Sequence, residues 1–225
     1  NAESSAASDV YKRQPQDAPE MVRSFVMHQG EKLNHAISIG HPDGLHYSVD
    51  LRRGSLLQFW RGDFADVTDM WYQRGHAQLL RPMEMAVTSQ AGLLAAVLQG
   101  PDAPYPTAYG AELTYKGYEL NQADLPTFQY QVGESLVTDQ YLADAENREL
   151  LRTIQVENPV EDLYTRVASA EYIQEVGNGY YSVGGAYYLR LETSAAPIIR
   201  NQPHGAEMLF PLTEASKEIT YAILW

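Results

Sequence analysis

The chain has 225 residues, of which 44% are hydrophobic, and its formal net charge of −13 comes from 29 acidic residues against 16 basic ones. This charge opposes binding to nucleic acids and to anionic membrane surfaces, since both depend on cationic contacts. The absence of cysteine excludes thiolate zinc sites, iron–sulfur clusters, covalently attached haem and cysteine nucleophiles, and no apolar run approaches the roughly 20 residues of a membrane-spanning helix.

The N-terminal stretch NAESSAASDVYKRQ is small and polar and shows no periodicity. Part of it looks like translated adapter sequence of the kind found in open reading frames assembled from environmental DNA, in which case the natural protein continues upstream. An ordinary disordered N-terminus is the alternative. We therefore expect residues 1–20 to be disordered or non-native and a single β-sandwich domain to span residues 21–225.

From about Met21 onward, the hydrophobic residues recur with a period of two, which is typical of strands that bury one face. Residues 45–51 show this alternation clearly. The same pattern predicts strands over 128–132, 152–156, 163–167, 187–191 and 219–225. Turns rich in glycine separate many of these segments, because glycine adopts positive φ at little cost.

Residues 171–192, EYIQEVGNGYYSVGGAYYLRLE, read as a three-stranded antiparallel meander. The best helical windows are short: residues 89–100, and residues 143–154, which read better as a turn feeding a strand. Three prolines in residues 99–110 predict a surface loop. The pattern as a whole predicts an all-β fold, namely a large antiparallel two-sheet β-sandwich.

Two stretches carry a resemblance to known families. Residues 127–158, TFQYQVGESLVTDQYLADAENRELLRTIQVEN, resemble the two-sheet supersandwich of galactose mutarotase-like domains. Residues 35–75, together with the ending EITYAILW, resemble a β-rich domain near the C-terminus of large exported bacterial proteins that join a sugar-dehydrogenase-like propeller to c-type cytochrome segments. The resemblance covers roughly residues 20–225 and implies an accessory domain of carbohydrate metabolism in the periplasm or outside the cell.

The stretch QFWRGDFADVTDMWYQRG, residues 58–75, is the candidate carbohydrate-binding surface, because such sites combine aromatic plates with planar polar groups. Strand alternation places Trp60 opposite Phe59 and makes it the predicted exposed plate. The alternative is that these aromatic side chains fill the space between sheets. The candidate binding residues are Trp60, Arg61, Asp63, Asp66, Trp71, Tyr72 and Arg74, with His46 and His76 nearby.

We expect a non-catalytic accessory domain that binds carbohydrate or packs against a sugar-oxidising domain of the same chain. An aldose-epimerase-like enzyme is one alternative, and it requires a histidine and a carboxylate on opposite sides of a sugar ring. The histidines available for that role are His35, His41, His46 and His76. A structural spacer is the other alternative. The acidic turn at 63–69 lacks a calcium-loop pattern, so we expect neither a metal nor another cofactor.

Overall fold

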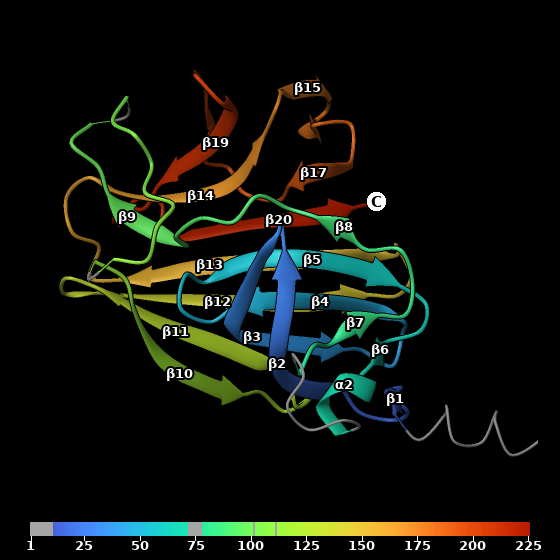
Figure 1. The fold of residues 1–225 in the computed structure, drawn as a ribbon. Coiled ribbons are helices and arrows are strands. Elements are labelled where there is room, and N and C mark those ends of the chain that lie inside the picture. The colour runs from blue at the N-terminus through green and yellow to red at the C-terminus, as the bar shows by residue number, and fades with distance from the viewer. Residues whose placement is uncertain (1–10, 72–77, 101, 111) are drawn as a thin grey trace, which may run out of the picture. The chain divides into compact units, whose positions relative to one another are not determined.

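The computed structural model describes residues 11–71, 78–100, 102–110 and 112–225 (Figure 1). Nearly all regular structure in these ranges is β, arranged as antiparallel sheets, and the helix α2 (Thr68–Trp71) has only four residues. The prediction of an all-β antiparallel sandwich is therefore confirmed.

The contacts divide the chain into two compact units. Unit 1 comprises Asn1–Leu51 and Leu56–Thr88, and unit 2 comprises Arg52–Ser55 and Ser89–Trp225. Residues 21–225, for which we expect a single domain, are thus shared between the two units. The division was hidden in the sequence because the period of two runs through both units without a linker-like break.

Unit 1 contains a five-stranded sheet and a small three-stranded sheet. The strands of the larger sheet, in spatial order, are β2 (Glu20–His28), β3 (Glu31–Gly40), β4 (Leu45–Asp50), β5 (Ser55–Arg61) and β8 (Val87–Thr88). The small sheet consists of β1 (Lys12–Arg13), β6 (Ala65–Asp66) and β7 (Arg81–Pro82). Strand β4 and the first six residues of β5 are buried throughout, so both faces of the sheet are covered there.

The start of the chain departs from expectation. Residues 11–20, which we assigned to the disordered segment, are ordered in unit 1: Lys12 pairs with Asp66, and the backbone N–H of Phe64 donates to the Gln14 side chain at 2.8 Å. Pro15 is buried. These contacts join segments far apart in the sequence, so local periodicity could not reveal them. Residues 1–10 lie outside the described residues.

Unit 2 packs an eight-stranded sheet against a four-stranded one. The larger sheet runs in the order β10 (Thr114–Leu120), β11 (Pro126–Val132), β12 (Ser135–Asp144), β13 (Glu149–Glu157), β20 (Glu218–Leu224), β17 (Tyr187–Leu191), β16 (Tyr180–Val183) and β15 (Ile173–Gly177). The smaller sheet runs in the order β18 (Ile198–Gln202), β19 (Gly205–Pro211), β14 (Leu163–Ala170) and β9 (Ala95–Val97). Strands β15, β16 and β17 form the predicted meander, and the 143–154 window is a turn feeding β13. The 89–100 window contains strand β9 rather than a helix.

The interior of unit 2 contains a buried ion pair. Arg152 on β13 donates to both carboxylate oxygens of Asp139 on β12, at 2.8 and 2.9 Å. The same guanidinium donates to the Tyr221 hydroxyl at 3.0 Å and to the carbonyl oxygen of Gly54 at 3.1 Å. Burial raises the pKa of the Tyr221 phenol. Every one of these contacts lies within unit 2, so the network is part of that unit's core.

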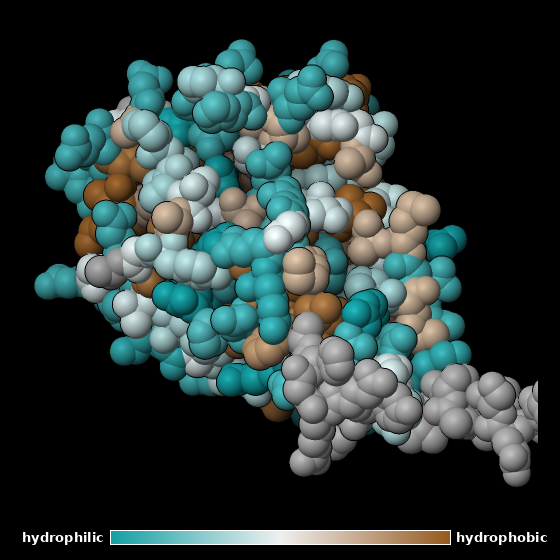
Figure 2. All heavy atoms as spheres, viewed as in Figure 1, coloured by the Kyte–Doolittle hydropathy of each residue, from teal (hydrophilic) through white to brown (hydrophobic). Residues whose placement is uncertain are grey.

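The surface in the view of Figure 2 is mainly hydrophilic, and the hydrophobic residues on it form small separate groups. Within the ranges that the structure describes, no helix is long and apolar enough to cross a membrane.

Candidate functional site

Trp60, the predicted plate, is buried. Its ring is 0% exposed and lies parallel to that of Phe64, with 5.9 Å between the centroids. The indole Nε1–H donates to the carbonyl oxygens of Asp63 at 3.1 Å and of Phe64 at 2.8 Å. The prediction that Trp60 is exposed is wrong, because the alternation gave its face correctly but a cluster with Phe64, Val67 and Leu80 covers that face.

His46 is also a core residue. Its ring lies 5.6 Å from the Trp60 ring and 5.1 Å from the Phe64 ring. Nδ1 accepts a hydrogen bond from the backbone N–H of His41, so Nε2 carries the proton and donates to the carbonyl oxygen of Gly62 at 2.8 Å. Burial lowers the pKa of His46, which favours the neutral ring. Its role is to hold the turn after β5 against the sheet.

The other residues of the predicted surface that the structure describes do not come together as a binding site. Arg61 is half-buried and Asp63 is exposed, while Asp66 accepts hydrogen bonds from the backbone N–H and hydroxyl of Thr68 at the start of α2. Asp69, the last acid of the turn, pairs with Arg81 at 2.6 Å. The side chain of Trp71, and all of Tyr72, Arg74 and His76, lie outside the described residues.

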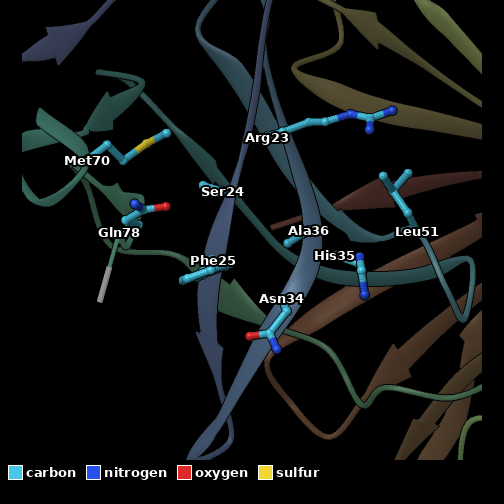
Figure 3. A pocket seen from close by; sticks show the side chains of 9 residues that line it. All are labelled: Arg23, Ser24, Phe25, Asn34, His35, Ala36, Leu51, Met70 and Gln78. Atoms are coloured by element: carbon cyan, nitrogen blue, oxygen red, sulfur yellow. The ribbon is translucent and has the colours of Figure 1, made fainter. Parts of the chain in front are cut away.

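A pocket of about 210 Å³ lies elsewhere in unit 1 (Figure 3). Strand β2 contributes three consecutive residues to it and strand β3 contributes another three. The other three are the residue directly after β4, one residue of α2 and the residue before Leu79. The lining residues are Arg23, Ser24, Phe25, Asn34, His35, Ala36, Leu51, Met70 and Gln78.

An irregularity in the β2–β3 ladder creates this pocket. The register runs evenly to the pair of Ser24 and Ala36 and then shifts, so that Val26 pairs with Leu33. Phe25 leaves the ladder and bonds instead to the crossing segment: its N–H donates to the carbonyl oxygen of Gln78 at 3.2 Å, and its carbonyl accepts from Leu80 at 3.0 Å. Such bulges re-aim side chains and are common next to active sites.

The lining has two halves. Figure 3 shows Ser24, Met70 and Gln78 on one side of β2, and Arg23 and His35 on the other. This follows from strand geometry, because the neighbours Arg23 and Ser24 point to opposite faces. Ser24, Met70 and Gln78 therefore place a hydroxyl, a thioether and an amide on one side of β2, whereas the side chains of Arg23 and His35 lie on its other side.

Ser24 is the unusual member of the set. It is only 8% exposed, and its hydroxyl oxygen has no hydrogen-bond partner among the residues that the structure describes. A buried hydroxyl without a partner lowers stability by about 1–3 kcal/mol, so native proteins rarely retain one without a reason. Rotation about its one side-chain torsion gives the hydroxyl three staggered positions from which to meet a group that enters the pocket.

The described lining of the pocket contains no pair of a histidine and a carboxylate. None of the nine described lining residues is an aspartate or glutamate, so His35 faces no carboxylate there. His41 does meet a carboxylate, with Nδ1 3.0 Å from Asp43 Oδ2, but the two residues belong to one turn and contact each other directly. That contact leaves no space for a sugar ring between an acid and a base.

A second hollow, of about 480 Å³, lies in unit 2 between the turns at 193–195 and 214–218. Its lining is polar and small, and an ion pair of 2.6 Å joins Lys217 to Glu214 across its rim. No aromatic side chain lines it, so it offers no plate for a sugar ring. Among the described residues, no group of three or more histidines, aspartates or glutamates is placed to hold a metal ion.

Sequence reasoning missed most of the pocket. It identified His35 only as one of several histidines, and it gave no role to Arg23, Ser24, Asn34 or Gln78. One signal was present in the strand 20–28, where Ser24 stands between Val22 and Val26 in the alternation and is buried, as Val26 is. Comparison with known proteins adds no candidate residues, since no protein-family model and no curated protein matches the chain.

Proposed function

We propose that the chain is a non-catalytic accessory domain that binds carbohydrate, and that the pocket at the β2–β3 bulge holds the sugar. The observation that carries the proposal is the lining itself: it combines the apolar side chains of Phe25 and Met70 with the amides of Asn34 and Gln78 and with the hydroxyl of Ser24, which has no partner among the described residues. Sugars present apolar C–H faces and pairs of vicinal hydroxyls, which match apolar surface and planar polar groups respectively.

The size of the pocket limits the ligand. Pockets for drug-sized molecules enclose roughly 300–1,000 Å³, and this one encloses about 210 Å³. One sugar ring or the end of a chain therefore fits better than an internal polysaccharide segment. The context of an exported, sugar-oxidising multidomain protein is supported by the resemblance of residues 35–75 and 218–225 to such proteins.

The test is isothermal titration of the protein with a panel of monosaccharides and short oligosaccharides. We expect saturable binding that Asn34→Ala weakens about 5-fold or more, because one amide contributes hydrogen bonds of about 1 kcal/mol each. Asn201→Ala is the matched control, since Asn201 is an exposed asparagine of unit 2 outside the pocket. Binding of no sugar at all overturns the proposal and favours a structural spacer.

The same protein separates the binding module from the enzyme. A binding module leaves the anomeric interconversion of free hexoses at its spontaneous rate. A clear acceleration that His35→Ala abolishes would establish the epimerase-like alternative instead.

A further inference from the structure

We propose that unit 2 carries a carbohydrate-binding surface of its own, which holds an extended neutral polysaccharide on the open face of the eight-stranded sheet. This inference goes beyond the proposed function, because its residues lie outside the pocket of unit 1 and its ligand is longer. Buried and partly exposed residues alternate along β11 and along most of β12. One face of these strands is therefore packed, and the other is open to a large ligand.

Threonine and glutamine side chains cover the middle of the open face, in two rows that run across neighbouring strands. None of these seven residues is charged, and none is buried. The first row is Thr127, Gln140, Thr153 and Thr220, the second is Gln129, Thr138 and Gln155, and together they are called the amide–hydroxyl face.

The lack of charge on this face contrasts with the rest of the chain, which has 29 acidic residues against 16 basic ones. Glu119 and Glu218 flank the rows on β10 and β20, so the rim is acidic. Amides and hydroxyls both donate and accept hydrogen bonds, as the vicinal hydroxyls of a sugar do. A neutral face with an acidic rim therefore suits a neutral polymer of sugars and disfavours a polyanion.

Contacts within the face orient part of it in advance. The hydroxyls of Thr153 and Thr220 are hydrogen bonded to each other at 3.1 Å. The Gln155 amide donates to the Glu218 carboxylate at 2.6 Å, which leaves the amide oxygen of Gln155 to accept from a ligand. Groups that are already oriented lose less side-chain entropy when a ligand binds.

Tyr188 on β17 provides an aromatic plate on the same face. It pairs with Leu224, which lies four residues after Thr220 and so on the same side of β20. Tyr188 is 46% exposed, whereas the preceding Tyr187 points to the opposite face and is buried. The apolar C–H face of a sugar ring can stack on Tyr188 while the next rings of the chain reach the amides.

The extent of the face favours a chain of sugars. Strands β11, β12, β13, β20 and β17 are consecutive neighbours in the sheet, and four steps between strands span roughly 19 Å. Several linked rings can lie across that distance. The composition also argues against a protein partner, because the cores of protein interfaces are mainly apolar and the middle of this face is amide and hydroxyl.

The experiment is affinity gel electrophoresis of the full chain in gels that contain soluble amylose, mixed-linkage β-glucan or galactomannan. Polygalacturonate serves as the acidic polymer. We expect at least one neutral polysaccharide to slow the protein and polygalacturonate to leave its migration unchanged, because the face offers no cation and its rim is acidic.

Variants assign the binding to the face. Tyr188→Ala and Gln140→Ala should each weaken retention about fivefold or more, since one removes the stacking ring and the other an amide at the centre of the rows. Tyr188→Phe keeps the ring and should stay within about twofold of the parent. Ile199→Ala and Asn201→Ala are the matched controls, because they remove an exposed apolar and an exposed amide side chain from β18 of the smaller sheet. Circular dichroism checks that each variant is folded.

The outcomes separate this inference from the proposed function. If no neutral polysaccharide slows the protein, the inference is wrong, while titration with short sugars still tests the unit 1 pocket. Retention that Asn34→Ala abolishes and Tyr188→Ala spares would place the polymer in that pocket and overturn the inference. A dimer in light scattering that Tyr188→Ala dissociates would make a second copy the occupant of the face, which also overturns it.

Discussion

Replacement of Asp139 tests the interior of unit 2 most directly. Asp139 is 0% exposed and is the counterion of Arg152, whose side chain is 5% exposed. Asp139→Ala removes two of the four hydrogen bonds that the guanidinium makes and leaves Tyr221 and Gly54 as its partners. Neither carries a negative charge, so the cation stays buried without a counterion. Breaking a buried pair in this way costs about 3–5 kcal/mol, a large part of the roughly 5–15 kcal/mol that stabilises a domain.

The assay is urea unfolding at constant pH, with the free energy of unfolding taken by linear extrapolation. The double variant Asp139→Leu with Arg152→Met should lose less stability than Asp139→Ala alone, since apolar pairs often replace buried ion pairs at little cost. Glu214→Ala is the control: it breaks the exposed pair with Lys217 and should cost less than about 1 kcal/mol. The reasoning is refuted if Asp139→Ala costs no more than Glu214→Ala, or if the double variant is less stable than both single ones.

Three further predictions concern unit 1. Trp60→Ala should cost about 3–5 kcal/mol in thermal or urea unfolding, because it empties a fully buried site and strands two carbonyl groups; a cost below about 1 kcal/mol would show an exposed ring. Burial lowers the folded-state pKa of His46, so the unfolded chain binds more protons than the folded chain below about pH 6.5. The free energy of unfolding should therefore fall as the pH drops through this range. His46→Gln should flatten this dependence on pH, whereas His204→Gln, at an exposed position, should not. Ser24→Ala should raise the free energy of unfolding of the ligand-free protein by about 1 kcal/mol while weakening sugar binding, and a loss of stability would mean that its hydroxyl is satisfied.

The strands were largely predictable because alternation is a local property of the chain. The predicted segments 45–51, 128–132 and 187–191 each fall on an observed strand, to within one residue. Alternation shows which side chains share a face of a strand, but it does not show what packs against that face. For Trp60 the cover is Phe64 and Leu80, and this cluster forms only when the chain turns back on itself.

The pocket could not be predicted from the alternation of hydrophobic residues. It depends on a register shift at Phe25 and on a segment more than fifty residues later that crosses at Gln78. The hydrophobic periodicity of the sequence does not show where the pairing register of two strands shifts, because the side chains on either side of a bulge resume the same alternation. The sequence does not indicate the boundary between the two units for a similar reason, because local composition does not show which distant residues contact one another.

The assignment of Arg52–Ser55 to unit 2 has a consequence for cooperativity. These four residues sit in the middle of the sequence of unit 1, and they supply the Gly54 carbonyl that Arg152 uses and the Arg53 carbonyl that accepts from Leu94. A fragment that begins at Ser89 lacks both acceptors, so unit 2 is not a separable module along the chain. The two units should therefore unfold in a single transition, and no one cut between them should release either as an intact fragment.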